Sequence, residues 1–172
     1  MNNITSKPSI STTRGAETTD FSAKPVRFTL FEDRFASFHV EVEEPSLDKL
    51  AKSLRATEAA SKDKLPWIKL ARVSGHPSDN GSLRYDAAIT ELWGVEGDYD
   101  GGIFPFEEAA GKIEAAEIEA LLYETASSTP ERPRWRVLAP TSRGYSGTTD
   151  ELEFAGEVGR AAQRSTRWGA RA

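Results

Sequence analysis

Short segments in which apolar and polar residues alternate recur along the chain, and this period of two predicts β-strands with one buried face. We expect strands over residues 26–31, 65–73, 87–99, 118–123 and 134–139. The segment 87–99 is mostly apolar, which is typical of a strand in the interior of a sheet.

Other segments show the helical spacing of apolar residues. Ser46 is a suitable N-cap for a helix that should end near Thr57. Residues 106–116 predict a second helix, because Pro105 suits a first turn and the early acidic residues favour the helix dipole. A further helix is expected over 148–163. Strands interspersed with helices indicate the α+β class, with one mixed sheet packed on helices.

Length and composition divide the chain into three parts. A length of 172 residues favours one domain. Residues 1–24 are rich in Ser, Thr and Asn without periodicity, and we expect them to form a disordered leader. The folded domain should occupy residues 25–155, and residues 156–172 form an Arg- and Ala-rich basic tail.

The composition excludes several classes of protein. The chain has no cysteine, which excludes disulfides, zinc–thiolate sites and thiol nucleophiles. It has neither an apolar signal core nor the roughly 18 consecutive apolar residues of a membrane span, so we expect a cytoplasmic protein without membrane contact. The two histidines lack the spacing of a zinc hydrolase, and Gly-rich phosphate loops are absent.

The net charge of −5 conceals a separation of charge along the chain. Residues 86–124 contain 11 acidic residues and one lysine, whereas residues 125–172 contain eight arginines and five acidic residues. This separation suits a site in which a metal ion and nucleic acid meet. It equally describes a solvated acidic helix beside a basic tail.

Two acidic residues mark the end of the apolar strand. Asp98 and Asp100 are two residues apart, so on a strand they would project to the same side. Paired carboxylates suit a hard divalent cation such as Mg²⁺ or Mn²⁺. Glu96, on the same face, is a candidate third ligand or supporting group. The alternative is turn chemistry before the two glycines that follow, with edge acids facing water.

Basic residues show a similar spacing on two predicted strands. Arg134 and Arg136 would share one strand face, where they suit contacts with triphosphate or a DNA backbone. Alternatively they form a solvated face, with Trp135 in the core. Lys69 and Arg72 are equally ambiguous candidates on another strand.

Taken together, several segments are more specific than any one motif. They comprise residues 29–31, the helix from Ser46, and residues 65–72, 81–84, 94–102 and 123–140. Over roughly residues 26–150 the chain resembles the N-terminal primase-polymerase module of phage and plasmid replication proteins that carry a virulence-associated-protein-E-like helicase part. This module belongs to the archaeo-eukaryotic primase superfamily.

The resemblance implies an RRM-like sheet with helices and template-directed nucleotidyl transfer with two divalent metals, Mg²⁺ or Mn²⁺. Asp98 and Asp100 match the acidic motif that holds the metals and would be the catalytic residues. Arg134 and Arg136 would lie near nucleotide or template phosphate. The implied partners are single-stranded DNA, nucleoside triphosphates and a helicase.

The chain departs from the family pattern in two places. Ser128 stands where the family has a nucleotide-contacting histidine, and serine can hydrogen-bond phosphate but cannot carry positive charge. The family's third acidic motif should lie well beyond Pro140, where the resemblance fades. We therefore expect an incomplete primase core, from a truncated or frameshifted gene, with impaired activity. The alternatives are a non-enzymatic nucleic-acid-binding module and a metal-dependent nuclease.

Overall fold

The structure is a computed structural model, and it describes residues 10–13, 24–32, 36–57, 59, 61 and 64–146. For residues 10–13 it describes the backbone alone. The helix expected over 148–163 and the tail over 156–172 lie outside the described residues.

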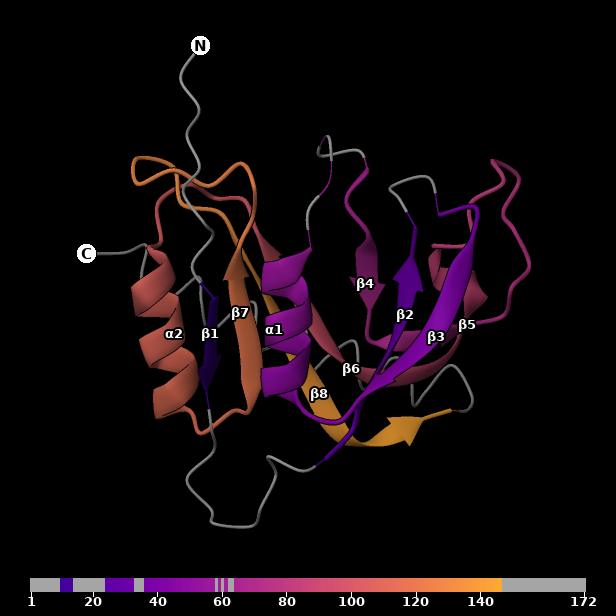
Figure 1. The fold of residues 1–172 in the computed structure, drawn as a ribbon, viewed down its shortest axis with the longest axis horizontal. Coiled ribbons are helices and arrows are strands. Elements are labelled where there is room, and N and C mark those ends of the chain that lie inside the picture. The colour runs from indigo at the N-terminus through magenta and orange to yellow at the C-terminus, as the bar shows by residue number, and fades with distance from the viewer. Residues whose placement is uncertain are drawn as a thin grey trace.

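The described strands form two antiparallel sheets (Figure 1). The five-stranded sheet has the order β1 (Ile10–Thr13), β7 (Ala120–Glu124), β8 (Trp135–Tyr145), β6 (Ile89–Tyr99) and β5 (Ala71–Val73). The three-stranded sheet has the order β3 (His39–Glu44), β2 (Val26–Phe31) and β4 (Trp67–Lys69). Two helices accompany them, so the α+β class is confirmed. The expectation of one mixed sheet is wrong, because every strand pair between described residues is antiparallel.

The single strand expected over 65–73 is divided between the two sheets at Leu70. The Leu70 N–H donates to the Glu96 carboxylate, and its carbonyl accepts a hydrogen bond from the Trp93 N–H. Leu70 is fully buried, and β4 before it and β5 after it belong to different sheets. The chain thus crosses between sheets at a residue whose backbone polar groups are both satisfied.

Strand β1 lies within the segment expected to be a disordered leader. Its four residues pair with β7 in the register Ile10↔Tyr123 to Thr13↔Ala120. The prediction is therefore wrong for residues 10–13, while most of 1–24 lies outside the described residues. The reason is that β7 offers an unpaired edge, and backbone hydrogen bonds to such an edge require little from the sequence of the added strand.

Both expected helices within the described residues are present. Helix α1 spans Leu47–Ala56, and the side chain of its N-cap, Ser46, accepts a hydrogen bond from the Lys49 N–H at 3.2 Å. Helix α2 spans Phe106–Ala115 and begins directly after Pro105. A short 3₁₀ helix at Asp86–Ala88 takes the place of the first residues of the strand expected over 87–99.

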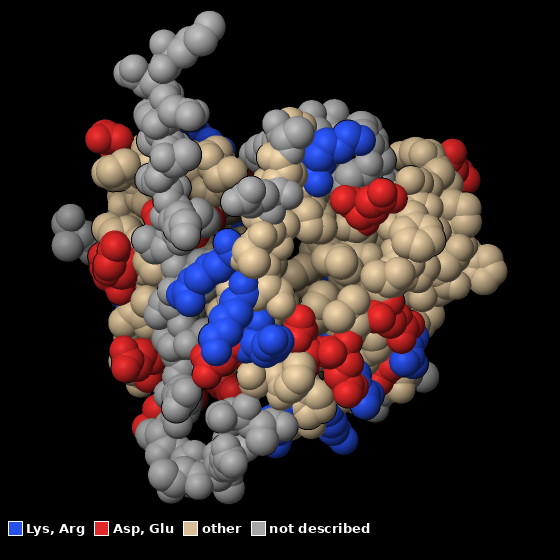
Figure 2. Space-filling model, viewed as in Figure 1, with Lys and Arg blue, Asp and Glu red and all other residues tan. Residues whose placement is uncertain are grey.

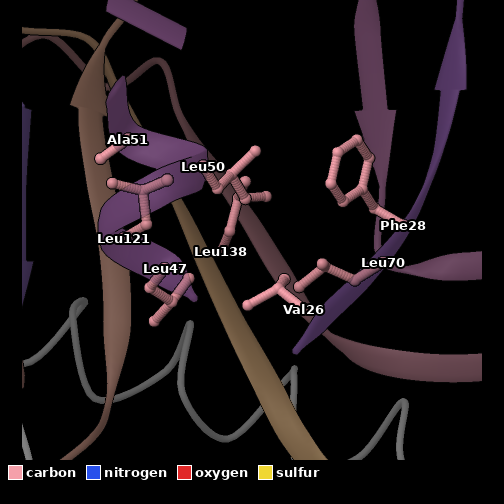
Figure 3. Close-up of a cluster of buried hydrophobic side chains, with 8 residues drawn as sticks. All are labelled: Val26, Phe28, Leu47, Leu50, Ala51, Leu70, Leu121 and Leu138. Carbon is pink, nitrogen blue, oxygen red and sulfur yellow. The ribbon is translucent and has the colours of Figure 1, made fainter. Parts of the chain in front are cut away.

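The helices lie on opposite faces of the five-stranded sheet. Figure 3 shows the cluster on the first face, made of Leu47, Leu50 and Ala51 of α1, Leu121 of β7, Leu138 of β8, Val26 and Phe28 of β2, and Leu70. On the other face, Phe106 and Ala109 of α2 pack in a cluster with Leu122 and Trp135. Leu121 and Leu122 separate the two clusters because successive residues of a strand point to opposite faces.

Helix α1 presents a basic surface outward. Its exposed residues include Lys49, Lys52 and Arg55, and Figure 2 shows lysine and arginine side chains gathered over this helix. Neither of the two helices in the described part of the chain has the length and apolar character needed to cross a lipid bilayer.

Candidate functional site

Three polar side chains form a row across the middle of the five-stranded sheet. Asp98 of β6 and Tyr123 of β7 are the Cα partners of Arg136 on its two sides. Arg136 Nη2 donates to Asp98 Oδ2 at 2.7 Å. Tyr123 and Arg136 are each two residues from a leucine of the α1 cluster, Leu121 and Leu138, so the row faces the same side of the sheet as α1.

A second acid–arginine pair lies beside the first. Asp100 follows the last residue of β6, and Arg134 precedes the first residue of β8. Their charged groups lie 3.6 Å apart, and Asp100 is well exposed. Arg134 Nε is buried and has no hydrogen-bond partner within the described residues. The structure therefore brings the predicted acids and arginines together, and pairs each acid with one arginine.

Electrostatic surroundings differ between the members of the row. Burial disfavours the charged form of Arg136, but its hydrogen bond and attraction to Asp98, with a contribution from Tyr123, raise its pKa. Burial raises the pKa of the Tyr123 hydroxyl, and nearby Arg136 opposes that rise. Arg136 is thus held fully charged at the centre of the row.

Glu96 lies deeper than Asp98 and has a different partner. Its carboxylate accepts the N–H of Leu70 at the crossing between the sheets. Burial raises the pKa of Glu96, and attraction to Lys69, the Leu70 hydrogen bond, and attraction to Arg136 and Arg84 oppose the rise. Glu96 therefore supports the crossing, and Lys69 contributes to this site by its charge beside Glu96.

Ser128 holds the loop that leads into β8. Its hydroxyl donates to Glu124 Oε1 at 3.0 Å and accepts the Arg134 N–H at 3.0 Å. These two bonds join both ends of the loop between β7 and β8. Ser128 therefore lies next to the backbone of Arg134, and its hydroxyl forms hydrogen bonds within the loop.

Arg72 is not part of this arrangement. Its guanidinium binds Glu41 at 3.0 and 3.2 Å and Glu91 at 3.0 Å, and it lies 5.3 Å from the Trp93 ring centroid. The hydrogen bond to Glu41 raises the pKa of Arg72. Lys69 and Arg72 were expected on one strand, but the chain changes sheets between them. Arg72 therefore contacts Glu41 and Glu91 and not the acids of the two pairs described above.

Two residues that the sequence reasoning did not select lie against the row. The guanidinium carbons of Arg84 and Arg136 are 3.9 and 4.6 Å from the ring centroid of Trp67. Arg84 belongs to one of the segments that carry the family resemblance, and Trp67 to another. Their place in these segments was the one indication that the sequence offered. Nothing in the local pattern shows that Trp67 and Arg84 meet, because their contact depends on the tertiary fold.

The carboxylates match the oxygen donors that Mg²⁺ and Mn²⁺ prefer. Asp98 and Asp100 supply two such groups, each of which is paired with an arginine. Within the described residues there is no group of three or more acidic or histidine side chains arranged to hold a metal ion. A cation bound here would need further oxygen ligands, which the phosphates of a nucleotide can supply.

Comparisons with protein-family models, with curated proteins and with solved structures found no match. The function proposed below therefore rests on the arrangement of these side chains together with the family resemblance of the sequence.

Proposed function

We propose that this chain is a primase-polymerase-like domain with an RRM-like core, which binds a nucleoside triphosphate and single-stranded DNA and performs nucleotidyl transfer with Mg²⁺ or Mn²⁺. The observation that supports this most directly is the arrangement at the ends of β6 and β8. Two carboxylates, Asp98 and Asp100, face two guanidiniums, Arg136 and Arg134, across neighbouring strands.

A metal–triphosphate complex carries the same alternation of charge. A divalent cation would take the place of the arginines beside the carboxylates, and phosphate oxygens would take the place of the carboxylates beside the arginines. Exposed ion pairs contribute only about 0.2–1 kcal/mol each, so their exchange costs little. Hydrogen bonds to charged groups contribute about 1.5–3 kcal/mol, so the new contacts outweigh that cost. Metal and nucleotide should therefore bind cooperatively.

The chain's own residues orient the ligand in this scheme. Arg134 and Arg136 bind phosphate oxygens through paired N–H donors. The hydrogen bond from the Arg134 N–H to Ser128 holds the backbone of Arg134 in place. A bound divalent metal supplies charge neutralisation and a lowered pKa of the attacking hydroxyl. The basic face of α1 lies on the same side of the sheet and suits contacts with the phosphates of a DNA strand. A cytoplasmic location and a helicase partner belong to the same proposal.

A second candidate is a nucleic-acid-binding module without chemistry. This candidate is favoured because Glu96 accepts the Leu70 N–H and Ser128 forms hydrogen bonds within its loop. Among the predicted site residues, only the carboxylates of Asp98 and Asp100 then remain to bind a metal. Such a module would bind single-stranded DNA in a salt-sensitive, metal-independent way.

The test is calorimetric titration with Mn²⁺, with and without a non-hydrolysable nucleoside triphosphate. We expect nucleotide to tighten metal binding at least about tenfold, in line with typical coupling energies, and Asp98→Asn/Asp100→Asn to abolish metal binding. The matched control is Asp79→Asn/Asp86→Asn, which removes two exposed acids elsewhere. Unchanged metal affinity in the Asp98/Asp100 variant would exclude the assigned site.

A labelled primer on a template then separates the remaining functions. Extension that requires metal and both carboxylates supports nucleotidyl transfer. Cleavage with the same requirements supports a nuclease. Salt-sensitive binding of the strand without metal, retained in the Asp98→Asn/Asp100→Asn variant and without extension, supports the second candidate.

A further inference from the structure

Arg84, Trp67 and Arg136 come from three separate segments and meet at one ring. Trp67 lies in β4, Arg136 lies in β8, and Arg84 lies between β5 and the 3₁₀ helix. The guanidinium carbons are 3.9 Å (Arg84) and 4.6 Å (Arg136) from the ring centroid, within the range of a cation–π contact. All three side chains are partly accessible to solvent. The ring thus holds two cationic groups at the surface of the sheet.

The two guanidiniums are not equally neutralised. Arg136 has its ion pair with Asp98. Arg84 has no salt bridge to any acid in the described part of the chain. Burial, and then repulsion from Arg136, lower the pKa of Arg84, and attraction to Glu96 opposes this fall only in part. The two positive charges of Arg84 and Arg136 therefore lie close together, and one ion pair, between Arg136 and Asp98, neutralises only one of them.

We propose that Arg84 and Arg136, held against Trp67, form an oxyanion site that takes a phosphate group of a nucleotide. A guanidinium held at an aromatic ring keeps N–H donors at its edge, and those donors match phosphate geometry. Arg84 has no salt bridge within the described residues, and Arg136 would exchange its exposed partner Asp98 for the phosphate. A bound phosphate would remove the repulsion between the two arginines.

The identity of the ligand as a nucleotide rests on the proposed function. The phosphate has two sources, the triphosphate of a free nucleotide or the phosphodiester backbone of a single strand, and these are separable by experiment.

The alternative is that Arg84 has only a structural role and covers the Trp67 ring. Removal of the guanidinium would then lower the free energy of unfolding and leave phosphate affinity and its salt dependence unchanged. The binding measurement and its salt dependence therefore separate the two roles.

The experiment compares Arg84→Gln with the wild-type chain, using inorganic tripolyphosphate without metal and an oligothymidylate over a range of salt concentrations. The matched control is Arg143→Gln, since Arg143 is an exposed arginine of β8 that lies near the Tyr145 ring. We expect Arg84→Gln to weaken tripolyphosphate binding about tenfold, as befits the loss of one charge-assisted contact. If the strand backbone is the source, the slope of log K against log salt should also fall by about 0.7. The control should change neither quantity.

The outcomes are distinct. Weaker tripolyphosphate binding with an unchanged DNA slope assigns the site to the nucleotide, and a reduced DNA slope assigns it to the strand. Arg84→Gln that binds both probes like the wild type overturns the proposal, as does a wild-type chain that binds neither.

A second variant covers the case in which Arg84→Gln does not fold. Arg84→Lys keeps the charge but loses the planar fork, so tripolyphosphate affinity should fall about threefold while the DNA slope stays unchanged. Unchanged tripolyphosphate affinity in this variant would again overturn the proposal. Because tripolyphosphate is used without metal, these results are independent of the Asp98→Asn/Asp100→Asn test of the proposed function.

Discussion

Asp98 and Arg136 are direct cross-strand partners, and their charged groups lie 2.7 Å apart between β6 and β8. The Asp98 side chain is 46% exposed, so solvent screens the pair and its coupling energy should be about 0.2–1 kcal/mol. An interaction of that size holds the two groups in position without preventing either from binding a ligand. Metal affinity at Asp98 should accordingly depend on what Arg136 is bound to.

Arg136→Gln should therefore strengthen Mn²⁺ binding in the absence of nucleotide. Removal of the competing cation frees the Asp98 carboxylate, and a surface pair of about 1 kcal/mol corresponds to roughly fivefold in affinity. Nucleotide should then add less to metal affinity than in the wild type, because one phosphate contact is lost. Calorimetry measures both quantities, and Arg143→Gln is the charge-matched control. If Arg136→Gln binds Mn²⁺ more weakly than the wild type in the absence of nucleotide, Arg136 does not compete with the metal for Asp98.

Ser128→Ala should lower the free energy of unfolding by about 2 kcal/mol, because two partly buried hydrogen bonds of about 1 kcal/mol each are lost. The substitution removes the acceptor for the Arg134 N–H and the donor to Glu124. Urea denaturation provides the measurement, and Ser142→Ala, at an exposed position of β8, is the control. An unchanged free energy together with a loss of nucleotide affinity would mean instead that the hydroxyl contacts the ligand.

Much of the local structure could be predicted because it depends on neighbouring residues. Ser46 and the apolar residues after it specify α1. The alternation around Trp135 predicts the first part of β8, which continues to Tyr145, beyond the expected end at residue 139. The approach of Asp98 to Arg136 also follows from the pattern once β6 and β8 are known to be neighbours. Periodicity gives each strand its faces but does not state which strands pair.

The remaining features depend on contacts between distant segments. The break at Leu70 arises because its N–H binds Glu96, a residue 26 positions further along the chain. The β1–β7 pairing uses backbone groups, which leave no mark on the side-chain pattern of residues 10–13. Arg72 and Lys69 are close in sequence yet belong to different sheets, so the prediction that one strand carries both is wrong.

Gly94→Ala should destabilise the fold by about 1–3 kcal/mol, the usual cost of overpacking. A β-carbon at Gly94 would lie 2.6 Å from the Ala139 carbonyl oxygen and 2.5 Å from Leu70 Cδ1. Ala139 is the partner of Val95 in the β6–β8 register, so its backbone cannot move without disturbing the strands that carry the site. The matched control is Gly111→Ala in α2, where no atom lies within 4 Å of the new β-carbon. It should stabilise by about 0.5–1 kcal/mol. Urea denaturation of both variants tests the contrast, and equal effects would contradict it.

Glu96 should make stability depend on pH, because burial raises the pKa of its carboxyl in the folded state. Below the ordinary glutamate pKa of about 4.3 the group is protonated in both states and burial carries no charge penalty. Between that value and the raised folded-state pKa, the unfolded chain ionises first, so stability falls as the pH rises. The slope for one such group is at most about 1.4 kcal/mol per pH unit.

Glu96→Gln removes this dependence while it keeps an oxygen that accepts the Leu70 N–H. As the pH rises from about 4 to about 8, the variant should therefore become more stable relative to the wild type. Urea denaturation in the presence of EDTA measures the free energy of unfolding of both proteins. Glu114→Gln, at an exposed position of α2, is the control and should show no such shift. A difference that stays constant with pH, or that shifts in favour of the wild type, would mean that the attraction of Lys69, Arg136 and Arg84 outweighs the burial of Glu96.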